Sequence, residues 1–600
     1  MQKYSMNRSE IIAEIRAFLK DKQLDACIIP STDPHMGEYI PAHWAAREWV
    51  SGFTGSAGTV VITDSFAGLW TDSRYFIQAE EQLQDCEMVL VKLKIPHTPE
   101  HLDWISENLP KNSTVAIDGK VISVSTAQQT ESTLHKHGIR IDTNIDIPAK
   151  IWKNRPSLPD AKIFDHSERY AGESRKEKIS RVREGLKEAK ADYILVCTLD
   201  EIAWLFNLRG KDVSFNPVFV SYALVSMEGA TLFIDPDKIP CELINEMQEQ
   251  GIGIMNYLDI HAILSSLPET SNILLDPGKT NYSLLKSLPK KIQIQEKLGL
   301  VTCMKAVKNP VEIEGLKKVM IKDGIAWVKF LCWLEKNIGK IEISELSASN
   351  KLESLRADQD LFQGPSFYPI SSFGEHGAII HYGVTEDSDI ELKINNIYLC
   401  DTGGQYLDGT TDTTRTVSLG QPTEQQKTDF TLVLKGTLGV SMLRFPAGTK
   451  GYQMDILARK ALWDHELNYG HGTGHGVGFF LNVHEGPQTI GTGASGNMNT
   501  AMEPGMVTTV EPGLYRPGQY GIRTENMTLV VEDVTNDFGS FLKFETLTLV
   551  PIDTNLINKE LLNPAEKEWL NSYHQIVYRK LRHGLDEDEK AWLEAKTKPI

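Results

Sequence analysis

The sequence predicts an α/β protein of three domains, in which two related α/β domains precede an α+β domain. The chain has 600 residues, whereas a single hydrophobic core stops growing at about 250–300 residues. Predicted strands and helices alternate in the first half, and their order repeats after residue 151. Beyond residue 309 the pattern changes to long helices and short β-runs broken by glycine. We therefore predict domains at residues 1–153, 154–306 and 307–600, the last with a C-terminal helical extension.

The first domain opens with an amphipathic helix. From about Ser9 onward, Ile12, Ile15 and Leu19 recur at helical spacing and so share one face. Three short apolar runs follow and predict strands, at residues 26–30, 59–62 and 68–70. A glycine-rich turn separates the first run from the other two. Gly52, Gly55 and Gly58 have the wrong spacing for a dinucleotide-binding loop, so we interpret them as turn residues.

The second domain repeats this order of elements. The predicted elements are a helix at residues 177–189, a strand at 193–197, a helix near 202–205 and strands at 218–225 and 230–234. The likeness between the two domains lies in the order of elements more than in the residues. Two copies of one α/β unit account for this order better than one large sheet does.

The third domain begins with a strong helix signal. Asn309 can cap a helix and Pro310 suits the first helical position. An apolar stripe continues from there through Leu316, Met320, Trp327, Leu331 and Leu334. Two more helices are predicted, near residues 424–443 and in the tail from residue 563 onward.

Composition excludes several classes of function. The formal charge of −18 argues against a nucleic-acid partner, because phosphate binding needs clustered Lys and Arg. The sequence has no run of eighteen apolar residues, so we predict no membrane span. Residues 1–14 lack the basic region and the apolar run of a secretion signal. The seven cysteines are scattered and odd in number, which is typical of reduced thiols in a cytoplasmic protein.

Five side chains of the third domain form a candidate metal set: Asp401, Asp412, His475, Glu511 and Glu525. Asp401 follows an apolar run at residues 397–400, so its carboxylate should emerge from a buried strand. A bare buried charge is very costly, and a cation or hydrogen bonds must compensate it. Glu511 and Glu525 also adjoin β-runs, and His475 lies in a glycine-rich segment.

The charges of this set predict two metal ions. Four carboxylates balance two divalent cations, and one imidazole completes a donor set rich in oxygen and free of thiolate. Such a set suits manganese better than structural zinc. Two metals about 4 Å apart can hold a bridging hydroxide and polarise a carbonyl, as peptide hydrolysis requires. Each acid taken alone could be an ordinary turn carboxylate, so the prediction depends on the whole set.

Four segments that contain these residues resemble the motifs of the pita-bread metallopeptidases: residues 401–416, 471–478, 510–513 and 523–526. That family includes methionine aminopeptidase, prolidase, X-prolyl aminopeptidase (aminopeptidase P) and creatinase. The chain is most similar to the long, three-domain cytosolic type of X-prolyl aminopeptidase. Segments outside the metal motifs also resemble it, at residues 50–59, 70–76, 308–312 and 569–571.

The resemblance implies a fold and an activity. The first two domains are expected to be creatinase-N-like and the third to be a pita-bread domain. The expected activity is release of the N-terminal residue from peptides whose second residue is proline, in a cytoplasmic homodimer. The alternatives are a prolidase-like dipeptidase and a pita-bread binding module without catalysis. Methionine aminopeptidase fits less well, because that enzyme is close to a lone catalytic domain.

The resemblance also implies roles for residues outside the metal set. His381 and His484 would hydrogen-bond the substrate or the oxyanion, and His471 would contact the peptide near proline. Tyr515 and Arg523 are expected around the proline pocket and the downstream chain. Besides binding metal, Glu511 would take a proton from the nucleophile and pass it to the leaving nitrogen.

Overall fold

The computed structural model describes residues 7–84, 86–95, 98–493 and 499–600. Contacts between residues divide the chain into two units. The first unit comprises the residues up to His166 together with Glu173–Val301, and the second comprises Ser167–Gly172 and Thr302–Ile600. This division does not test the domain boundaries at residues 153 and 306, which remain predictions.

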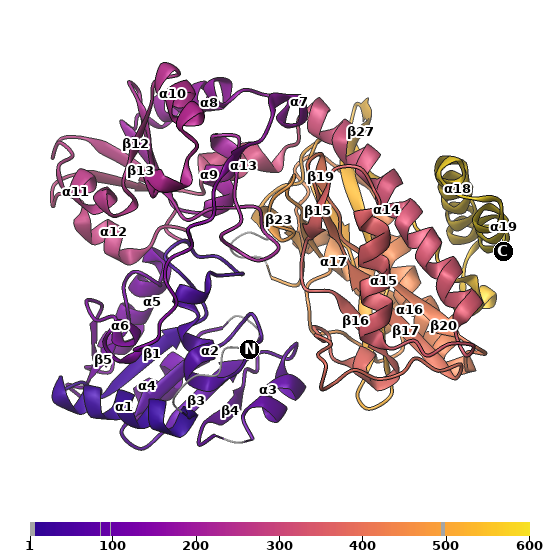
Figure 1. Cartoon of the computed structure of the whole chain (residues 1–600), viewed down its shortest axis with the longest axis horizontal. Helices are drawn as coiled ribbons and strands as arrows, with labels where there is room; N and C mark the ends of the chain where they lie inside the picture. The colour runs from indigo at the N-terminus through magenta and orange to yellow at the C-terminus, as the bar shows by residue number, and fades with distance from the viewer. Residues whose placement is uncertain (1–6, 85, 96–97, 494–498) are drawn as a thin grey trace. The chain divides into compact units, whose positions relative to one another are not determined.

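The first half of unit one is built on a six-stranded sheet of order β4-β3-β2-β1-β5-β6 (Figure 1). Its strands are β1 (Ala26–Pro30), β2 (Thr59–Thr63), β3 (Ala67–Thr71), β4 (Val89–Lys92), β5 (Thr114–Ala116) and β6 (Arg140–Asp142). Its helices are α1 (Arg8–Asp21), α2 (Ala46–Ser51), α3 (Phe76–Gln82), α4 (Glu100–Asn108), α5 (Val124–His135) and α6 (Ile147–Ile151). The helix and three strands predicted before residue 71 are confirmed, and Ile12, Ile15 and Leu19 are buried on α1.

The second half carries another six-stranded sheet, of order β12-β11-β10-β8-β13-β14. Its strands are β8 (Tyr193–Val196), β10 (Tyr222–Ser226), β11 (Ala230–Phe233), β12 (Ile252–Met255), β13 (Asn272–Leu275) and β14 (Gln293–Glu296). Its helices are α8 (Arg175–Ala189), α9 (Leu199–Leu205), α10 (Cys241–Glu249), α11 (Ile260–Ser265), α12 (Tyr282–Ser287) and α13 (Leu300–Ala306), the last of which continues into unit two. A short pair, β7 (Phe164–Asp165) and β9 (Leu208–Arg209), lies outside this sheet.

The two sheets have the same topology. In the first sheet, β1 pairs antiparallel with β2 and parallel with β5. In the second sheet, β8 pairs antiparallel with β10 and parallel with β13. The remaining strand pairs also match between the two sheets: each antiparallel pair of the first sheet corresponds to an antiparallel pair of the second, and each parallel pair to a parallel pair. The predicted duplication of one α/β unit is therefore present in the fold.

One predicted strand is shorter than expected. The apolar run at residues 218–225 predicts one strand, but β10 begins only at Tyr222. The preceding backbone bonds to a nearby loop instead of the sheet, since Asp212 N–H donates to the Val218 carbonyl and Val220 N–H to the Asp212 carboxylate. Apolar alternation cannot distinguish such a packed loop from a strand.

Unit two combines several sheets with long helices. The largest sheet has the order β21-β28-β27-β24-β22-β23, and two three-stranded sheets have the orders β16-β17-β20 and β15-β18-β19. Their strands are β15 (Phe362–Pro365), β16 (Ile370–Phe373), β17 (Asn396–Thr402), β18 (Gly404–Tyr406), β19 (Gly409–Thr410), β20 (Thr413–Leu419), β21 (Arg444–Pro446), β22 (Gly474–Gly476), β23 (Glu485–Ile490), β24 (Val507–Val510), β27 (Asn526–Asn536) and β28 (Gly539–Thr546). β25 (Gly513–Arg516) and β26 (Tyr520–Arg523) form a separate two-stranded hairpin.

The helices of unit two are α7 (Glu168–Ala171), α14 (Pro310–Asn337), α15 (Glu345–Ala357), α16 (Glu424–Ser441), α17 (Gly451–Trp463), α18 (Pro564–Leu581) and α19 (Glu587–Lys596). α14 starts as predicted, because the Asn309 side chain accepts from Val311 and Glu312 N–H groups and Glu312 completes a capping box. α14 packs on α15, which packs on β15 and β16 (Figure 1). The predicted helices near residues 424–443 and after residue 563 are confirmed as α16 and α18.

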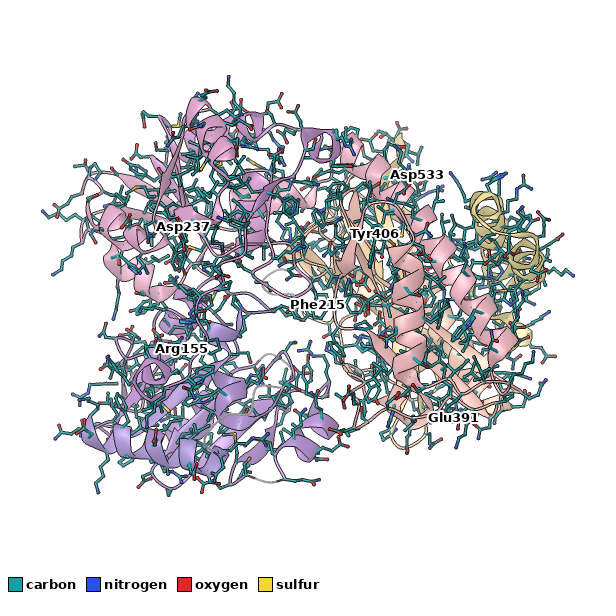
Figure 2. All side chains as sticks on the ribbon, in the orientation of Figure 1. Arg155, Phe215, Asp237, Glu391, Tyr406 and Asp533 are labelled. Atoms are coloured by element: carbon teal, nitrogen blue, oxygen red, sulfur yellow. The ribbon has the colours of Figure 1, made fainter. Side chains whose placement is uncertain are left out.

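A buried network ties the end of β17 to α14 and α15. Tyr406, labelled in Figure 2, donates its hydroxyl proton to Asp323 Oδ1 at 3.1 Å. Asp323 also pairs with Arg356 at 2.7 Å, and Arg356 donates to Thr402 Oγ1 at 2.6 Å. These groups are almost fully buried, and losing one partner of a buried pair costs about 3–5 kcal/mol. The backbone beside Asp401 is therefore held firmly.

Among the described residues, no helix is long and apolar enough to cross a membrane.

Candidate metal centre and active site

Two neighbouring strands carry the first two predicted metal ligands. Asp401 lies near the end of β17, and Asp412 immediately precedes β20. β17 and β20 pair antiparallel, with Asp401 opposite Thr414. Asp401 and Asp412 are therefore brought to the same end of this sheet, and both are buried.

The other three predicted ligands come from the largest sheet. β24 lies between β22 and β27, which places His475 on β22, Glu511 just after β24 and Glu525 just before β27. Glu511 and Glu525 flank the paired residues Val510 and Asn526 and so share one end of the sheet. Thr414 joins the two sheets, because its hydroxyl donates to Glu525 Oε2 at 2.8 Å and its carbonyl accepts from Glu525 N–H at 3.2 Å.

The side chains of these ligands converge on one point. Ligand atoms of Asp412, His475 and Glu525 all lie within 4.8 Å of one another. His475 Nε2 is 3.5 Å from Asp412 Oδ2 and 3.3 Å from Glu511 Oε1. Asp401 adds its charge to this cluster, and its buried Oδ1 has no hydrogen-bond partner among the described residues. A bound cation would compensate a buried carboxylate oxygen that accepts no hydrogen bond. The residues present therefore fit a metal centre.

The electrostatics of the cluster point the same way. Burial, and then the charges of neighbouring carboxylates, hold the pKa values of Asp412 and Glu525 well above the ordinary range. Burial also raises the pKa of Glu511, but its hydrogen bond with His475 and the charge of that imidazole outweigh burial and lower it to about 2. This excess of buried negative charge is compensated by divalent cations far better than by one imidazolium.

Three of the residues expected around the substrate form a chain that starts at Asp401. Arg523 donates to Asp401 Oδ2 at 2.6 Å and to the Tyr515 hydroxyl oxygen at 2.7 Å. Tyr515 OH lies 2.8 Å from His471 Nε2, and His471 Nδ1 lies 2.7 Å from the Gly472 carbonyl. The carbonyl assigns the proton to Nδ1, so Nε2 accepts from Tyr515. The structure thus brings Tyr515, Arg523 and His471 together beside Asp401, a predicted metal ligand.

His471 is electrically neutral near pH 7 in this setting. Burial is the largest influence on its pKa, which falls to about 4 although the charge of Glu511 works in the opposite direction. Burial likewise raises the pKa of Tyr515 to about 12. Both side chains therefore act as fixed hydrogen-bonding groups and not as charges at neutral pH.

The other two histidines lie at the borders of the cluster. His484 is exposed just before β23, and its ring stands edge-on to the His475 ring at 4.3 Å between centroids. Glu485, the next residue, is buried and pairs with Lys305 and Lys308 at 2.7 and 2.5 Å. His381 is half-buried on a turn after η4 (Gly374–Ala378). The contacts of His381 and His484 with a substrate remain predictions.

Glu345 on α15 holds the segment that carries His381, and the sequence analysis missed it. Its buried carboxylate accepts from Phe373 N–H at 2.6 Å and from the Tyr382 hydroxyl at 2.9 Å. It also lies 2.9 Å from His376 Nδ1. The contacts thus bracket His381 in the chain. No local pattern distinguishes Glu345 from an ordinary helix glutamate.

Two threonines orient predicted ligands, and the sequence analysis also missed them. Thr509 donates to Glu511 Oε1 at 3.2 Å and accepts from His475 N–H at 3.1 Å. Thr414 acts on Glu525 in the same way. Hydrogen bonds of this kind fix the orientation of metal ligands. The abundance of threonine in residues 409–416 is the only signal in the sequence that could have indicated such a role.

Two glycines allow η4 to approach β26, which ends at Arg523. A Cβ on Gly521 would lie 1.7 Å from the Gly377 carbonyl oxygen, which neither backbone can avoid without moving. We expect Gly521→Ala to destabilise unit two by about 1–3 kcal/mol, the usual cost of overpacking, and to lower kcat/KM by displacing both Arg523 and the His381 turn. Differential scanning calorimetry and peptide hydrolysis measure the two effects.

Gly229→Ala is the matched control, because a Cβ there meets no atom within 4 Å. It should leave both the melting temperature and kcat/KM near their wild-type values. A Gly521→Ala protein that melts and turns over like the Gly229→Ala protein would contradict the close approach of η4 and β26.

Comparison with known proteins agrees with this architecture. Residues 11–155 and 154–312 each match a family described as the creatinase/prolidase N-terminal domain. Residues 314–532 match metallopeptidase family M24, and residues 540–600 match the C-terminal region of peptidase M24. Two N-terminal domains of the creatinase type followed by a pita-bread domain are therefore confirmed, and they define a metallopeptidase.

Similarity over the full length narrows this class. A protein of Aspergillus flavus named probable Xaa-Pro aminopeptidase P is 41% identical over 99% of this chain and 93% of its own length. A protein of Penicillium rubens with the same name is 40% identical over 99% of both chains. The chain belongs to the Xaa-Pro aminopeptidase P family.

A solved structure supports the same assignment. The X-prolyl aminopeptidase of Caenorhabditis elegans is described as a cytosolic enzyme with a di-nuclear active site. It matches with a TM-score of 0.94 and 34% identity over 99% of this chain and 100% of that one. The prediction of a metal-dependent aminopeptidase is thus confirmed at the level of the family.

Proposed function

We propose that this protein removes the N-terminal residue from peptides whose second residue is proline, using two divalent metal ions. The observation that carries the proposal is the buried convergence of Asp412, His475 and Glu525. It occurs in a chain that is 41% identical over nearly its whole length to a probable Xaa-Pro aminopeptidase P. Asp401 and Glu511 complete the proposed ligand set, since both lie against this cluster.

The residues of the site can divide the work of hydrolysis among them. When bound, divalent ions supply Lewis acidity and lower the pKa of a water molecule. Glu511 is held by Thr509 and His475, so it can take the proton of the attacking water and deliver it to the leaving proline nitrogen. His381 and His484 are proposed to donate hydrogen bonds to the oxyanion as it forms.

The chain of Arg523, Tyr515 and His471 is proposed to border the proline side of the scissile bond. The proline nitrogen of an Xaa-Pro bond carries no hydrogen, so it cannot donate a hydrogen bond to an acceptor of the enzyme. The neutral His471 and the aromatic face of Tyr515, whose rings lie 5.4 Å apart, offer an apolar edge to a pyrrolidine ring instead. Arg523 fixes both through Tyr515 while pairing with Asp401.

Manganese is the proposed metal. The proposed donors are four carboxylates and one imidazole, and no thiolate is among them. Oxygen-rich sites with one nitrogen donor suit manganese and similar hard ions. We also propose a cytoplasmic location, which cysteines without a disulfide among the described residues and the cytosolic C. elegans relative support.

A matched peptide series tests the substrate. After chelation and addition of Mn²⁺, we expect rapid release of the first residue from Xaa-Pro-Yaa peptides. Peptides with alanine in place of proline should react at least about tenfold more slowly, and N-acetylated peptides should not react. Faster cleavage of bare Xaa-Pro dipeptides would identify a prolidase instead. Equal rates on the alanine series would refute proline specificity.

The assembly proposed by family resemblance is a homodimer. A closed two-fold dimer is the commonest homo-oligomer of soluble proteins. Sedimentation velocity at micromolar concentration should give a species of twice the mass of the 67.2 kDa chain. A species of monomer mass at ten micromolar would rule this assembly out.

A further inference from the structure

A pocket lies in the first half of unit one, at the carboxyl ends of β1 and β5. The two strands are parallel neighbours, but β1 leads to β2 on one side of the sheet and β5 leads to β6 on the other. Where the chain leaves adjacent parallel strands in opposite directions, the loops diverge and leave a crevice that often holds a ligand. The pocket is small and partly open to solvent, and it is lined by the ends of β1 and β5 and by residues 145–148.

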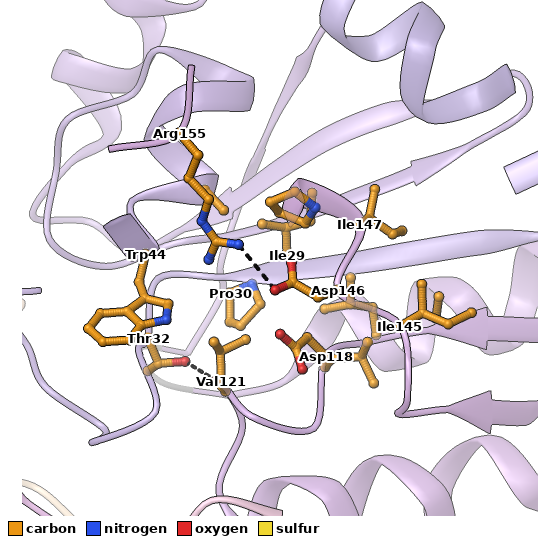
Figure 3. Close-up of a pocket in the computed structure, with 15 residues that line it drawn as sticks. Ile29, Pro30, Thr32, Trp44, Asp118, Val121, Ile145, Asp146, Ile147 and Arg155 are labelled. Atoms are coloured by element: carbon orange, nitrogen blue, oxygen red, sulfur yellow. Dashed lines mark hydrogen bonds and ion pairs between the residues drawn. The ribbon is translucent and has the colours of Figure 1, made fainter. Parts of the chain in front are cut away.

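The walls of this pocket are mostly apolar, with a few polar groups. Ile28, Ile117, Ile145 and Pro148 are among the side chains that line it, and Trp44 covers one side. Figure 3 shows the carboxylates of Asp118 and Asp146 directed toward the same space, with Arg155 above them. An apolar cavity with a small number of convergent polar groups is the usual form of a small-molecule site.

Asp146 is fully engaged by the protein itself. Its Oδ1 accepts from Ala149 N–H at 2.9 Å, and its Oδ2 pairs with Arg155 NH1 at 3.1 Å. Asp118 is different. Its Oδ1 accepts from Lys120 N–H at 2.9 Å, and among the described residues no donor is within hydrogen-bond distance of its Oδ2. One carboxylate oxygen of this half-buried residue therefore faces the pocket without a protein donor among the described residues.

The second sheet provides an internal control for this feature. Val115 on β5 and Ile273 on β13 occupy the same register position, so Asp276 corresponds to Asp118. Asp276 Oδ1 accepts a hydrogen bond from Gly278 N–H, just as Asp118 Oδ1 accepts one from Lys120 N–H. Asp276 Oδ2, however, accepts from Gly299 N–H at 3.0 Å. Both carboxylate oxygens of Asp276 thus accept hydrogen bonds from the backbone, whereas Oδ2 of Asp118 faces the pocket.

The partial burial of Asp118 also has an electrostatic consequence. Burial is the largest influence on its pKa and raises it to about 6, although the charges of Lys120 and Arg155 act in the opposite direction. Two carboxylates and one guanidinium leave the pocket with an excess of negative charge. A cation bound against Asp118 would remove this penalty, and the Trp44 ring could add a cation–π contact.

We propose that this pocket binds a small organic ammonium ion, with its –NH₃⁺ group on Asp118 Oδ2 and its aliphatic part against the isoleucine and proline walls. The narrow interior limits the ligand to a compact one. A simple alkylamine and a free aliphatic amino acid share this ammonium chemistry. The carboxylate of an amino acid would have Arg155 as its partner.

Calorimetric titration of the full-length, metal-loaded protein tests the proposal. The probes are n-propylammonium, its neutral analogue 1-propanol, and L-valine. We expect n-propylammonium to bind at least about tenfold more tightly than 1-propanol. Tighter binding of L-valine would identify an amino-acid site, and tighter binding of n-propylammonium an amine site. Equal affinity for n-propylammonium and 1-propanol would overturn the proposal.

Three variants locate the binding. Asp118→Asn keeps the volume of the side chain and the acceptor for Lys120 N–H, and it should weaken n-propylammonium binding at least about tenfold. Ala46→Leu narrows the pocket from α2 and should abolish binding, while the melting temperature shows that the domain remains folded. Asp64→Asn, at an exposed turn of the same domain, should bind like the wild type. Unchanged affinity in both Asp118→Asn and Ala46→Leu would place the ligand elsewhere, for example in the metal centre.

Discussion

Replacing Asp412 by asparagine should abolish peptide hydrolysis, lowering kcat/KM by at least about a thousandfold, because the metal ions supply several kcal/mol of transition-state stabilisation. The same change should make the metal-free protein more stable. Burial and the charges of Asp401 and Glu511 raise the pKa of Asp412 in the folded state. At neutral pH this raised pKa costs folding free energy, which asparagine removes at nearly constant volume. Wild-type protein should bind two Mn²⁺ ions and gain melting temperature from them, and the variant should lose most of that gain.

Metal analysis, calorimetry with and without Mn²⁺, and peptide hydrolysis measure these three effects. Asp387→Asn is the matched control, since it makes the same chemical change at an exposed position of the same unit. The control should behave as wild type in all three assays. Near-normal turnover in Asp412→Asn would remove Asp412 from the proposed metal set, and so would an undiminished rise of melting temperature with Mn²⁺.

Replacing Glu511 by glutamine should lower kcat by about 10²–10⁴, the range of general acid–base catalysis, with a smaller change in KM. Glutamine preserves the shape of the side chain and an acceptor for Thr509, which donates to Glu511 Oε1 at 3.2 Å. It cannot take a proton from water at neutral pH. The loss should persist at saturating Mn²⁺, which separates proton transfer from weakened metal binding.

Glu503→Gln is the control for this variant, because Glu503 is an exposed glutamate shortly before β24 in the same unit. Hydrolysis of Xaa-Pro-Yaa peptides across a series of Mn²⁺ concentrations gives kcat and KM for both proteins. Recovery of wild-type kcat in Glu511→Gln at high Mn²⁺ would show that Glu511 acts on the metals alone and transfers no proton.

Much of the local structure could be predicted from the sequence. α14 begins at Pro310 because Asn309 and Glu312 cap it, and both residues lie within one turn of the helix start. The strand ends that carry Asp401 and Glu511 are also visible as apolar runs followed by a carboxylate. Capping and strand periodicity depend on neighbours a few residues away, so a single segment contains the whole signal.

The prediction at residues 218–225 failed for a related reason. Its alternating apolar residues satisfy the pattern of a strand, but the backbone before Tyr222 bonds to the Asp212 loop. Burial produces the same pattern in either case. Which partner the backbone N–H groups find depends on the packing of another segment, and the pattern carries no information on it.

The types of metal ligand were evident from the sequence, whereas their convergence was decided by tertiary structure. Asp412, His475 and Glu525 come from two different sheets, which Thr414 joins by hydrogen bonds to Glu525. Resemblance to a known family indicated Tyr515 and Arg523. Their link to Asp401 and His471 appears only when β25 and β26 pair as a hairpin.

Asp118 and Asp276 show most clearly what each level determines. Both follow a strand at the same register position, and both accept a hydrogen bond from the N–H two residues on. The sequence by itself determined this turn, since donor and acceptor lie within three residues. Gly299 lies far along the chain from Asp276, and only the tertiary structure brings its N–H to the second carboxylate oxygen. Asp118 receives no such donor among the described residues, and its oxygen is left facing a pocket.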